Sequence, residues 1–222
     1  MMRKALIYGT GKTALVLQEY VQYGYEIAGF VVPAAYRVSE YFLDKPVLPL
    51  ENIQETHSAA EHCFFVAVGY HRMNVVRAEI IEDLEQRGYI LPPLIDSRAV
   101  IADGVRVGAA SIVLDNVSVQ PGARIGRGNF VWSNSVVAHG VTVEDYCWIT
   151  SGAVIAGDSV VASNCFLGIN CTVGHNLKLG EKTFVGAGSV VTKNTAPDSV
   201  LVAREAELGR LDSTRFLSLA QV

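Results

Sequence analysis

Three positions in the second half of the chain could together perform acid–base chemistry. His139 and His175 are thirty-six residues apart, and Gly157 lies midway between them. A histidine gains and loses a proton near neutral pH, so either side chain could act as a general base. A glycine leaves space beside such a base, and its backbone N–H could donate to a developing oxyanion. The alternative is that each histidine is an ordinary solvent-facing residue.

A glycine-rich loop near the start of the chain could hold a phosphate. The segment Gly9-Thr10-Gly11-Lys12-Thr13-Ala14 lies between a strand-like and a helix-like stretch, as in the loose dinucleotide fingerprint. Such a turn presents backbone N–H groups and a helix N-terminus to an anion. The alternative is a tight strand–helix turn without a ligand.

Two details of this loop argue against NAD and ATP. The second strand ends in Val31-Val32-Pro33 and carries no acid for a ribose hydroxyl, and Leu6 occupies the place of the first glycine of a P-loop. The third strand ends in Gly69-Tyr70-His71. Because ligands bind beyond the carboxyl ends of parallel strands, both loops should face one crevice. We therefore expect the pyrophosphate of a nucleotide sugar there.

A six-residue repeat predicts the elements that position the two histidines. An aliphatic residue returns at every sixth position from Ile95 to Val191 without interruption, and the position four residues later is mostly small or β-branched. A strict hexapeptide period is typical of a β-helix in which each hexad forms one short side of a coil. One large and one small inward residue per side would fill a narrow triangular interior.

The repeat fixes how the three candidate residues stack. If three hexads form one coil, residues eighteen apart lie above one another, and successive coils are about 4.8 Å apart. His139, Gly157 and His175 then form one column at one corner, and the two histidines lie roughly 9.6 Å apart. The sequence therefore predicts a single corner that carries both the base and the glycine.

The first ninety residues do not follow the six-residue repeat and have a different hydrophobic pattern. Strand-like stretches at 4–9, 25–32 and 62–69 alternate with helix-like stretches at 12–24 and 71–88. This alternation predicts a small parallel α/β sheet of the Rossmann-like kind. Pro92 and Pro93 mark the boundary. We expect a nucleotide-sugar-binding domain at 1–92, a β-helix at 93–200 and a short helical tail at 201–222 that covers the open end of the β-helix.

Composition excludes several classes of function. The net charge of the 222 residues is −4, which argues against nucleic acid as the main partner. No run of eighteen apolar residues is present, so no membrane span is predicted, and the N-terminus has no signal-peptide pattern. Three of the four cysteines occupy small hexad positions, so we expect core residues in a reduced, cytoplasmic protein.

At this point the sequence resembles a known family, the bacterial hexapeptide-repeat sugar acyltransferases. This group includes sialic-acid O-acetyltransferases and the N-acetyltransferases of the bacillosamine pathway. The resemblance extends from "IYGTGK" to "VVTKN" and is most specific in 164–194, "NCFLGINCTVGHNLKLGEKTFVGAGSVVTKN". It implies a left-handed β-helix, a homotrimer, and acetyl-CoA bound in the groove between neighbouring subunits.

The resemblance also implies roles for individual residues. His139 would be the general base, and the N–H of Gly157 would polarise the thioester carbonyl. The segments Gly168-Ile169-Asn170 and Gly186-Ala187-Gly188 would line the pantetheine and nucleotide arm of CoA. We also assign Trp148, Gly157 and His175 to the residues that bind CoA. The glycine loop and residues 69–71 would hold the nucleotide of the sugar, and we expect no metal.

The sequence departs from the family pattern at four places. Relatives carry an acid or a second histidine directly after the base, where this chain has Gly140, and Glu144 or Asp145 would orient the base only if the loop folds back. Trp148 stands where some relatives have a histidine. The second strand lacks its terminal acid, and "VLVAREAEL" replaces the glycine–proline turn after the last coil.

These observations predict an acetyl-CoA-dependent acyltransferase that acetylates a sugar. The acceptor that they favour is the amino group of a nucleotide-linked amino sugar. Three alternatives remain open: a sialic-acid-type O-acetyltransferase, a non-catalytic β-helix scaffold, and a zinc enzyme of the trimeric β-helix carbonic-anhydrase kind.

Overall fold

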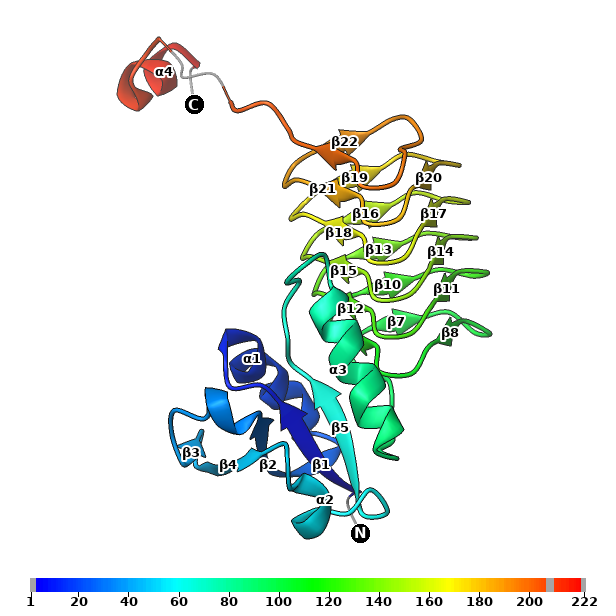
Figure 1. The fold of residues 1–222 in the computed structure, drawn as a ribbon. Coiled ribbons are helices and arrows are strands. Elements are labelled where there is room, and N and C mark those ends of the chain that lie inside the picture. The colour runs from blue at the N-terminus through cyan, green and yellow to red at the C-terminus, as the bar shows by residue number, and fades with distance from the viewer. Residues whose placement is uncertain (1–2, 207–209, 221–222) are drawn as a thin grey trace.

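The computed structural model describes residues 3–206 and 210–220. The chain begins with a small α/β domain and continues into a tall prism of short parallel strands (Figure 1). The elements of the first domain are, in chain order, β1 (Arg3–Tyr8), α1 (Lys12–Val21), β2 (Tyr25–Val32), a 3₁₀ turn (Ala34–Tyr36), β3 (Tyr41–Phe42), β4 (Lys45–Pro49), α2 (Ile53–Thr56), β5 (His62–Val66) and α3 (Val75–Gln86).

The sheet of the first domain is mixed rather than purely parallel. Its strand order is β3-β4-β2-β1-β5. β1 pairs in parallel with β2 and β5, and β4 pairs in parallel with β2, whereas β3 and β4 form an antiparallel hairpin. The prediction of three parallel strands was therefore correct for β1, β2 and β5, but it missed the hairpin at the edge of the sheet.

The prism consists of two-residue strands that recur every six residues from 94 to 191, as the hexads predict, and one more strand follows at 200–201. The strands are β6 (Leu94–Ile95), β7 (Val100–Ile101), β8 (Arg106–Val107), β9 (Ile112–Val113), β10 (Ser118–Val119), β11 (Arg124–Ile125), β12 (Phe130–Val131), β13 (Val136–Val137), β14 (Thr142–Val143), β15 (Trp148–Ile149), β16 (Val154–Ile155), β17 (Val160–Val161), β18 (Phe166–Leu167), β19 (Thr172–Val173), β20 (Lys178–Leu179), β21 (Phe184–Val185), β22 (Val190–Val191) and β23 (Val200–Leu201).

These strands form three parallel sheets, one for each side of the prism. We call the side of β6, β9, β12, β15, β18, β21 and β23 the aromatic face, because Phe130, Trp148, Phe166 and Phe184 point outward from it. The side of β7, β10, β13, β16, β19 and β22 is the valine face, and the side of β8, β11, β14, β17 and β20 is the basic face. Paired residues on one side are eighteen apart, as in Val136↔Val154, so three hexads make one coil.

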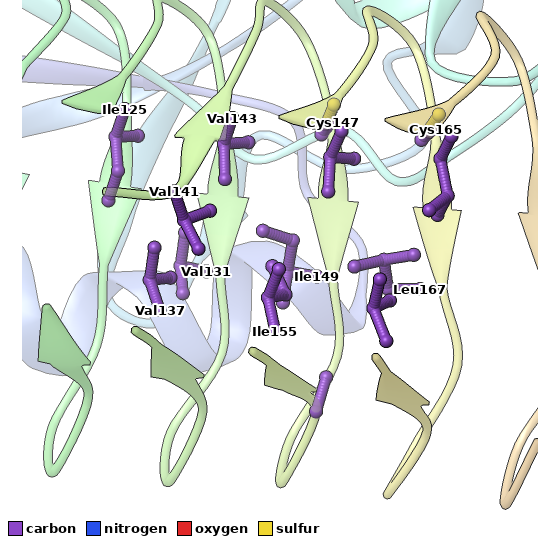
Figure 2. Close-up of a cluster of buried hydrophobic side chains, with 14 of the residues drawn as sticks. Ile125, Val131, Val137, Val141, Val143, Cys147, Ile149, Ile155, Cys165 and Leu167 are labelled. Carbon is purple, nitrogen blue, oxygen red and sulfur yellow. The ribbon is translucent and has the colours of Figure 1, made fainter. Parts of the chain in front are cut away.

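The inward residues fill the prism as the two-position pattern predicts. Aliphatic side chains such as Val137, Ile149 and Ile155 point into the interior and are fully buried (Figure 2). The small positions are buried as well, and serine hydroxyls among them donate to carbonyl oxygens of the following coil, as Ser159 does to Gly174 at 2.7 Å. All four cysteines are buried and unpaired.

The C-terminal helix does not cover the open end of the prism. α4 (Ser213–Ala220) lies apart from the last coil at the end of an extended segment (Figure 1). Its apolar side chains Leu217 and Leu219 are exposed. The prism instead ends with β23, which pairs with β21 after a longer turn. The expectation of a capping tail was wrong, because β23 itself supplies the last layer of backbone hydrogen bonds.

Candidate active site

His139 lies at the corner between the valine face and the basic face, in the turn from β13 to β14. Its backbone N–H donates to Oε1 of Gln120 on the preceding coil at 3.0 Å. The imidazole ring rests against Gly157, one coil further along. A Cβ atom at Gly157 would stand 2.6 Å from Cε1 and 3.0 Å from Cδ2 of His139, and it would overlap Nε2. Glycine is therefore the residue that leaves room for the ring in this position.

His175 occupies the same corner one coil beyond Gly157, as the eighteen-residue spacing predicts. Asp158 lies on the coil between those of the two histidines, and its Oδ2 is 4.0 Å from Nε2 of His175. The backbone N–H of Asp158 donates to the carbonyl oxygen of His139 at 2.9 Å. Asp158 was not among the residues selected from the sequence.

The two acids considered as partners of His139 are engaged at another corner. Oε2 of Glu144 accepts hydrogen bonds from the backbone N–H and the hydroxyl of Ser163, each at 3.1 Å. Oδ1 of Asp145 accepts from the backbone N–H of Arg127 at 2.9 Å. Both carboxylates thus stabilise the turn between the basic and aromatic faces and do not fold back toward His139.

A groove of about 550 Å³ runs along the aromatic face. Four of the residues predicted to bind the cofactor line it: Trp148, Gly168, Ile169 and Ala187. Its floor is a ladder of aromatic rings, in which Phe166 and Phe184 stack at 4.6 Å between centroids. A groove with this apolar lining suits the apolar part of a long ligand chain.

Glycine at the rim of this groove permits close packing of the coils. A Cβ at Gly168 would stand 2.5 Å from the backbone nitrogen of Ala187. Asn170, Gly186 and Gly188 belong to the same corner but do not line the groove itself. Asn170 and Gly188 have left-handed backbones, with φ of 53° and 66°, and they form the sharp turns into the valine face.

A second cavity, of about 650 Å³, lies at the carboxyl ends of β1 and β5. The predicted residues Gly9, Gly11, Lys12, Gly69, Tyr70 and His71 all line it. Thr10 instead lines a smaller cavity of about 240 Å³ beside the β3–β4 hairpin. Gly9 needs its φ of 110°, whereas Gly11 is the N-cap of α1 and has open space around its Cα.

The first domain also brings two charged groups that the sequence did not indicate. Arg72 lines the large cavity and has a left-handed backbone, with φ of 51°. The carboxylate of Glu51 accepts the backbone N–H of Ala34 at 3.1 Å, so it lies at the end of β2. β2 carries no acid at its own end, but Glu51, in the segment after β4, supplies one there. The sequence alone could not show this, because it depends on the pairing of β4 with β2.

Tyr70 connects the two cavities, because it lines both. Its ring packs against Phe166 with centroids 4.5 Å apart and against Trp148 at 5.8 Å. The crevice of the first domain and the groove on the aromatic face therefore adjoin within one chain. His139, Gly157 and His175 do not join them, since they lie at the corner between the other two faces.

A buried arginine fixes the first domain to the prism. The guanidinium of Arg77, on α3, donates to the carbonyl oxygens of Gly128, Tyr146 and Cys147 at 3.0–3.2 Å and to Oδ1 of Asn74 at 2.9 Å. Burial lowers the pKa of Arg77 to about 9, so the group remains a cation at neutral pH. It also lies 5.0 Å from the ring centroid of Trp148. These contacts fix α3 against the prism.

Within residues 3–206 and 210–220, no three His, Cys, Asp or Glu side chains of one chain come together as metal ligands. No helix in this part of the chain is both long and apolar enough to cross a membrane.

Comparison with known proteins supports the architecture. Residues 122–157 and 158–193 match the family described as bacterial transferase hexapeptide (six repeats). A comparison with curated proteins gives no significant match. The acetyltransferase domain of PglB from Neisseria gonorrhoeae superposes with a TM-score of 0.79 at 26% identity, over 88% of this chain and 94% of that chain.

Two further solved structures superpose over most of the chain. The same gonococcal domain in complex with acetyl coenzyme A gives a TM-score of 0.80 at 25% identity, over 89% of this chain and 94% of that one. A mutant of perosamine N-acetyltransferase from Caulobacter crescentus, in complex with CoA and GDP-perosamine, gives 0.82 at 24% identity, over 90% and 93%. The predicted fold, a left-handed β-helix after a small α/β domain, is confirmed, and the chain is an acyltransferase with the architecture of the hexapeptide-repeat sugar acetyltransferases.

Proposed function

We propose that this protein transfers the acetyl group of acetyl-CoA to the amino group of a nucleotide-linked amino sugar. The observation that carries the proposal is the position of Tyr70, which lines both the crevice of the first domain and the aromatic groove. A nucleotide held in the crevice would extend its sugar past Tyr70 toward the groove. The gonococcal domain, solved with acetyl coenzyme A, supports acetyl-CoA as the second substrate.

The crevice has the groups that a pyrophosphate requires. Gly11 caps α1, so backbone N–H groups of the first turn are free to donate, and Lys12 and Arg72 supply positive charge. A cavity of about 650 Å³ has the size of a small-molecule site. The perosamine N-acetyltransferase, whose fold this chain shares, is solved with a nucleotide sugar, GDP-perosamine.

The chemistry requires one base and one oxyanion donor. The amine nitrogen of the sugar attacks the thioester carbonyl, and a C–N bond forms. His139 takes the proton that the nitrogen sheds, and the N–H of Gly157 donates to the oxygen that becomes negative. The C–S bond then breaks, and the thiolate of CoA receives the proton. The products are an amide and free CoA.

A complete site in this scheme combines two protomers. His139 lies at the corner between the valine and basic faces, whereas the groove lies on the aromatic face of the same prism, so His139 of one protomer would face the groove of its neighbour. The valine face supports this arrangement, because Val100, Val154 and Val190 point outward from it and are 68%, 36% and 66% exposed. Apolar patches of this kind mark interaction surfaces. We propose a homotrimer with one site at each interface.

The decisive experiment measures release of the CoA thiol from acetyl-CoA with a panel of GDP-, UDP- and dTDP-linked amino sugars, and with sialic acid as an O-acetyl acceptor. We expect turnover with at least one nucleotide-linked amino sugar. Turnover with sialic acid alone would identify an O-acetyltransferase instead. Absence of thiol release with every acceptor would favour the scaffold, and zinc bound at the interface of the purified trimer would favour the metal enzyme.

Variants of the two histidines test the assignment of the base. His139→Ala should lower kcat by about 10²-fold or more, because general-base catalysis is lost, and acetyl-CoA should still bind. His175→Ala should mainly raise KM for one substrate. Near-normal kcat in His139→Ala together with loss of kcat in His175→Ala would contradict the proposed base.

A further inference from the structure

Asp158 lies at the His139 corner in a geometry that its backbone imposes. Its φ is 60°, a left-handed conformation that Asp and Asn tolerate better than most residues. Its backbone N–H is tied to the carbonyl oxygen of His139 at 2.9 Å. This coil-to-coil bond recurs at other corners, and here it places the backbone of Asp158 directly above that of the candidate base.

The carboxylate of Asp158 turns back onto Gly140. A Cβ at Gly140 would overlap Oδ1 of Asp158 and stand 3.4 Å from its Cγ. The same geometry recurs at another corner, where a Cβ at Gly152 would stand 3.2 Å from Cγ of Asn170. A left-handed corner residue thus directs a short side chain toward the glycine one coil below. At position 158, however, that side chain is a carboxylate beside a histidine.

The second oxygen of the same carboxylate faces His175, with Oδ2 4.0 Å from Nε2. Asp158 therefore lies on the coil between those of the two histidines, and its carboxylate occupies the space that the missing side chain of Gly140 leaves open. An acid at position 140 and the carboxylate of Asp158 could not both occupy this space.

We infer that Asp158 is the positioning residue for His139, and that it supplies from the next coil the negative charge that relatives carry directly after the base. This inference rests on the proposed function. When His139 accepts the proton of the nucleophile, an imidazolium forms beside Gly140. The carboxylate of Asp158 stabilises that cation until the proton passes to the CoA thiolate, and it does not itself take up the proton.

Steady-state kinetics with Asp158→Asn tests this role. Asparagine keeps the shape and accepts the left-handed backbone, but it removes the charge. We expect kcat to fall about 10- to 100-fold, KM for both substrates to stay within about twofold, and the melting temperature to remain unchanged. Asp198→Asn is the matched control, because Asp198 is also an exposed left-handed corner residue, with φ of 58°, and lies outside the site.

A double variant that moves the charge gives the sharper result. Asp158→Gly should lose activity as Asp158→Asn does, and Gly140→Asp in that background should restore kcat to within about fivefold of wild type, since the carboxylate returns to the same space. A merely structural role of Asp158 would not be rescued in this way. Unchanged kcat in Asp158→Asn, or a failure of rescue in a folded double variant, would overturn the role of Asp158 alone. A wild-type protein that acetylates no acceptor would overturn the proposed function together with it.

Discussion

At the residue scale, the candidate site depends on the missing side chain of Gly157. Its φ is not left-handed, so alanine is compatible with the backbone, yet a Cβ would overlap Nε2 of His139. The imidazole is the flexible partner and would swing away. His139 would then no longer lie beside the N–H at position 157, the proposed oxyanion donor, while the coils remain packed.

Gly157→Ala should accordingly lower kcat by about 10- to 100-fold without a change in melting temperature. Steady-state kinetics and thermal unfolding measure the two effects. Gly24→Ala is the control, because Gly24 shares the non-left-handed backbone but has open space around it and lies outside the site. Full activity in Gly157→Ala would mean that the ring of His139 need not rest on this corner during catalysis.

Gly11 tests the crevice in a similar way. Its Cα faces open space, so valine should fit without strain, but the added methyl groups would stand where a phosphate approaches the backbone. Gly11→Val should raise KM for the sugar nucleotide about tenfold or more and leave acetyl-CoA binding nearly unchanged. Isothermal titration with each ligand separates the two. Equal weakening of both ligands would indicate misfolding rather than a lost phosphate site.

Site residues whose positions follow from their spacing could be predicted from the sequence. Site residues whose roles depend on the direction of a side chain could not. The eighteen-residue arithmetic placed His139 beside Gly157. It could not show that Asp158 turns back toward Gly140, because that direction follows from a left-handed φ. Nor could it place Arg72 in the crevice, since that depends on the path of the loop before α3.

At the scale of elements, α3 is the link between the domain and the prism, and Arg77 carries that link. Four oxygen atoms receive hydrogen bonds from its guanidinium. The carbonyl oxygen of Cys147 also accepts the backbone N–H of Phe130 at 2.9 Å, but the other three would be left without a donor if the side chain were shortened or made apolar. Each buried polar group left unsatisfied costs about 1–3 kcal/mol.

Arg77→Met should therefore lower the free energy of unfolding by about 3–5 kcal/mol. Denaturant titration followed by tryptophan fluorescence measures this effect, because Trp148 lies against the guanidinium. Glu79→Gln on the same helix is the control, since its ion pair with Arg72 is exposed and should contribute less than about 1 kcal/mol. Equal stability of both variants would show that other contacts hold α3 in place.

The elements themselves were predictable to different degrees. The hexads predicted the strands of the prism, because each large inward residue sits in a two-residue strand. The β3–β4 hairpin was missed for physical reasons: its turn uses Leu43 and Asp44 with positive φ, and its second strand contains Pro46. Positive φ at both central residues is the geometry of a common hairpin turn, but Leu-Asp is not the Asn-Gly or Asp-Gly sequence that signals this turn, and proline is uncommon in strands.

At the scale of the whole molecule, the separation of His139 from the aromatic groove leads to a test of the trimer. The His139→Ala variant lacks the base but keeps the groove. The Ile169→Trp variant keeps the base, and its large ring should fill the groove, which Ile169 lines with 55% of its surface exposed. Each homotrimer should be inactive in acetyl transfer.

Trimers that contain both variants should regain activity, because a site is complete wherever an intact His139 of one protomer faces an intact groove of the next. Every trimer that contains both variants has one such site among its three, so the doubly purified protein should show about a third of wild-type kcat per site. Differently tagged variants are co-expressed, doubly purified and assayed, and light scattering should give three times the mass of one chain. If the mixed protein stays inactive, or if a monomer is active, each site must be formed within a single chain, and the valine face must have another role.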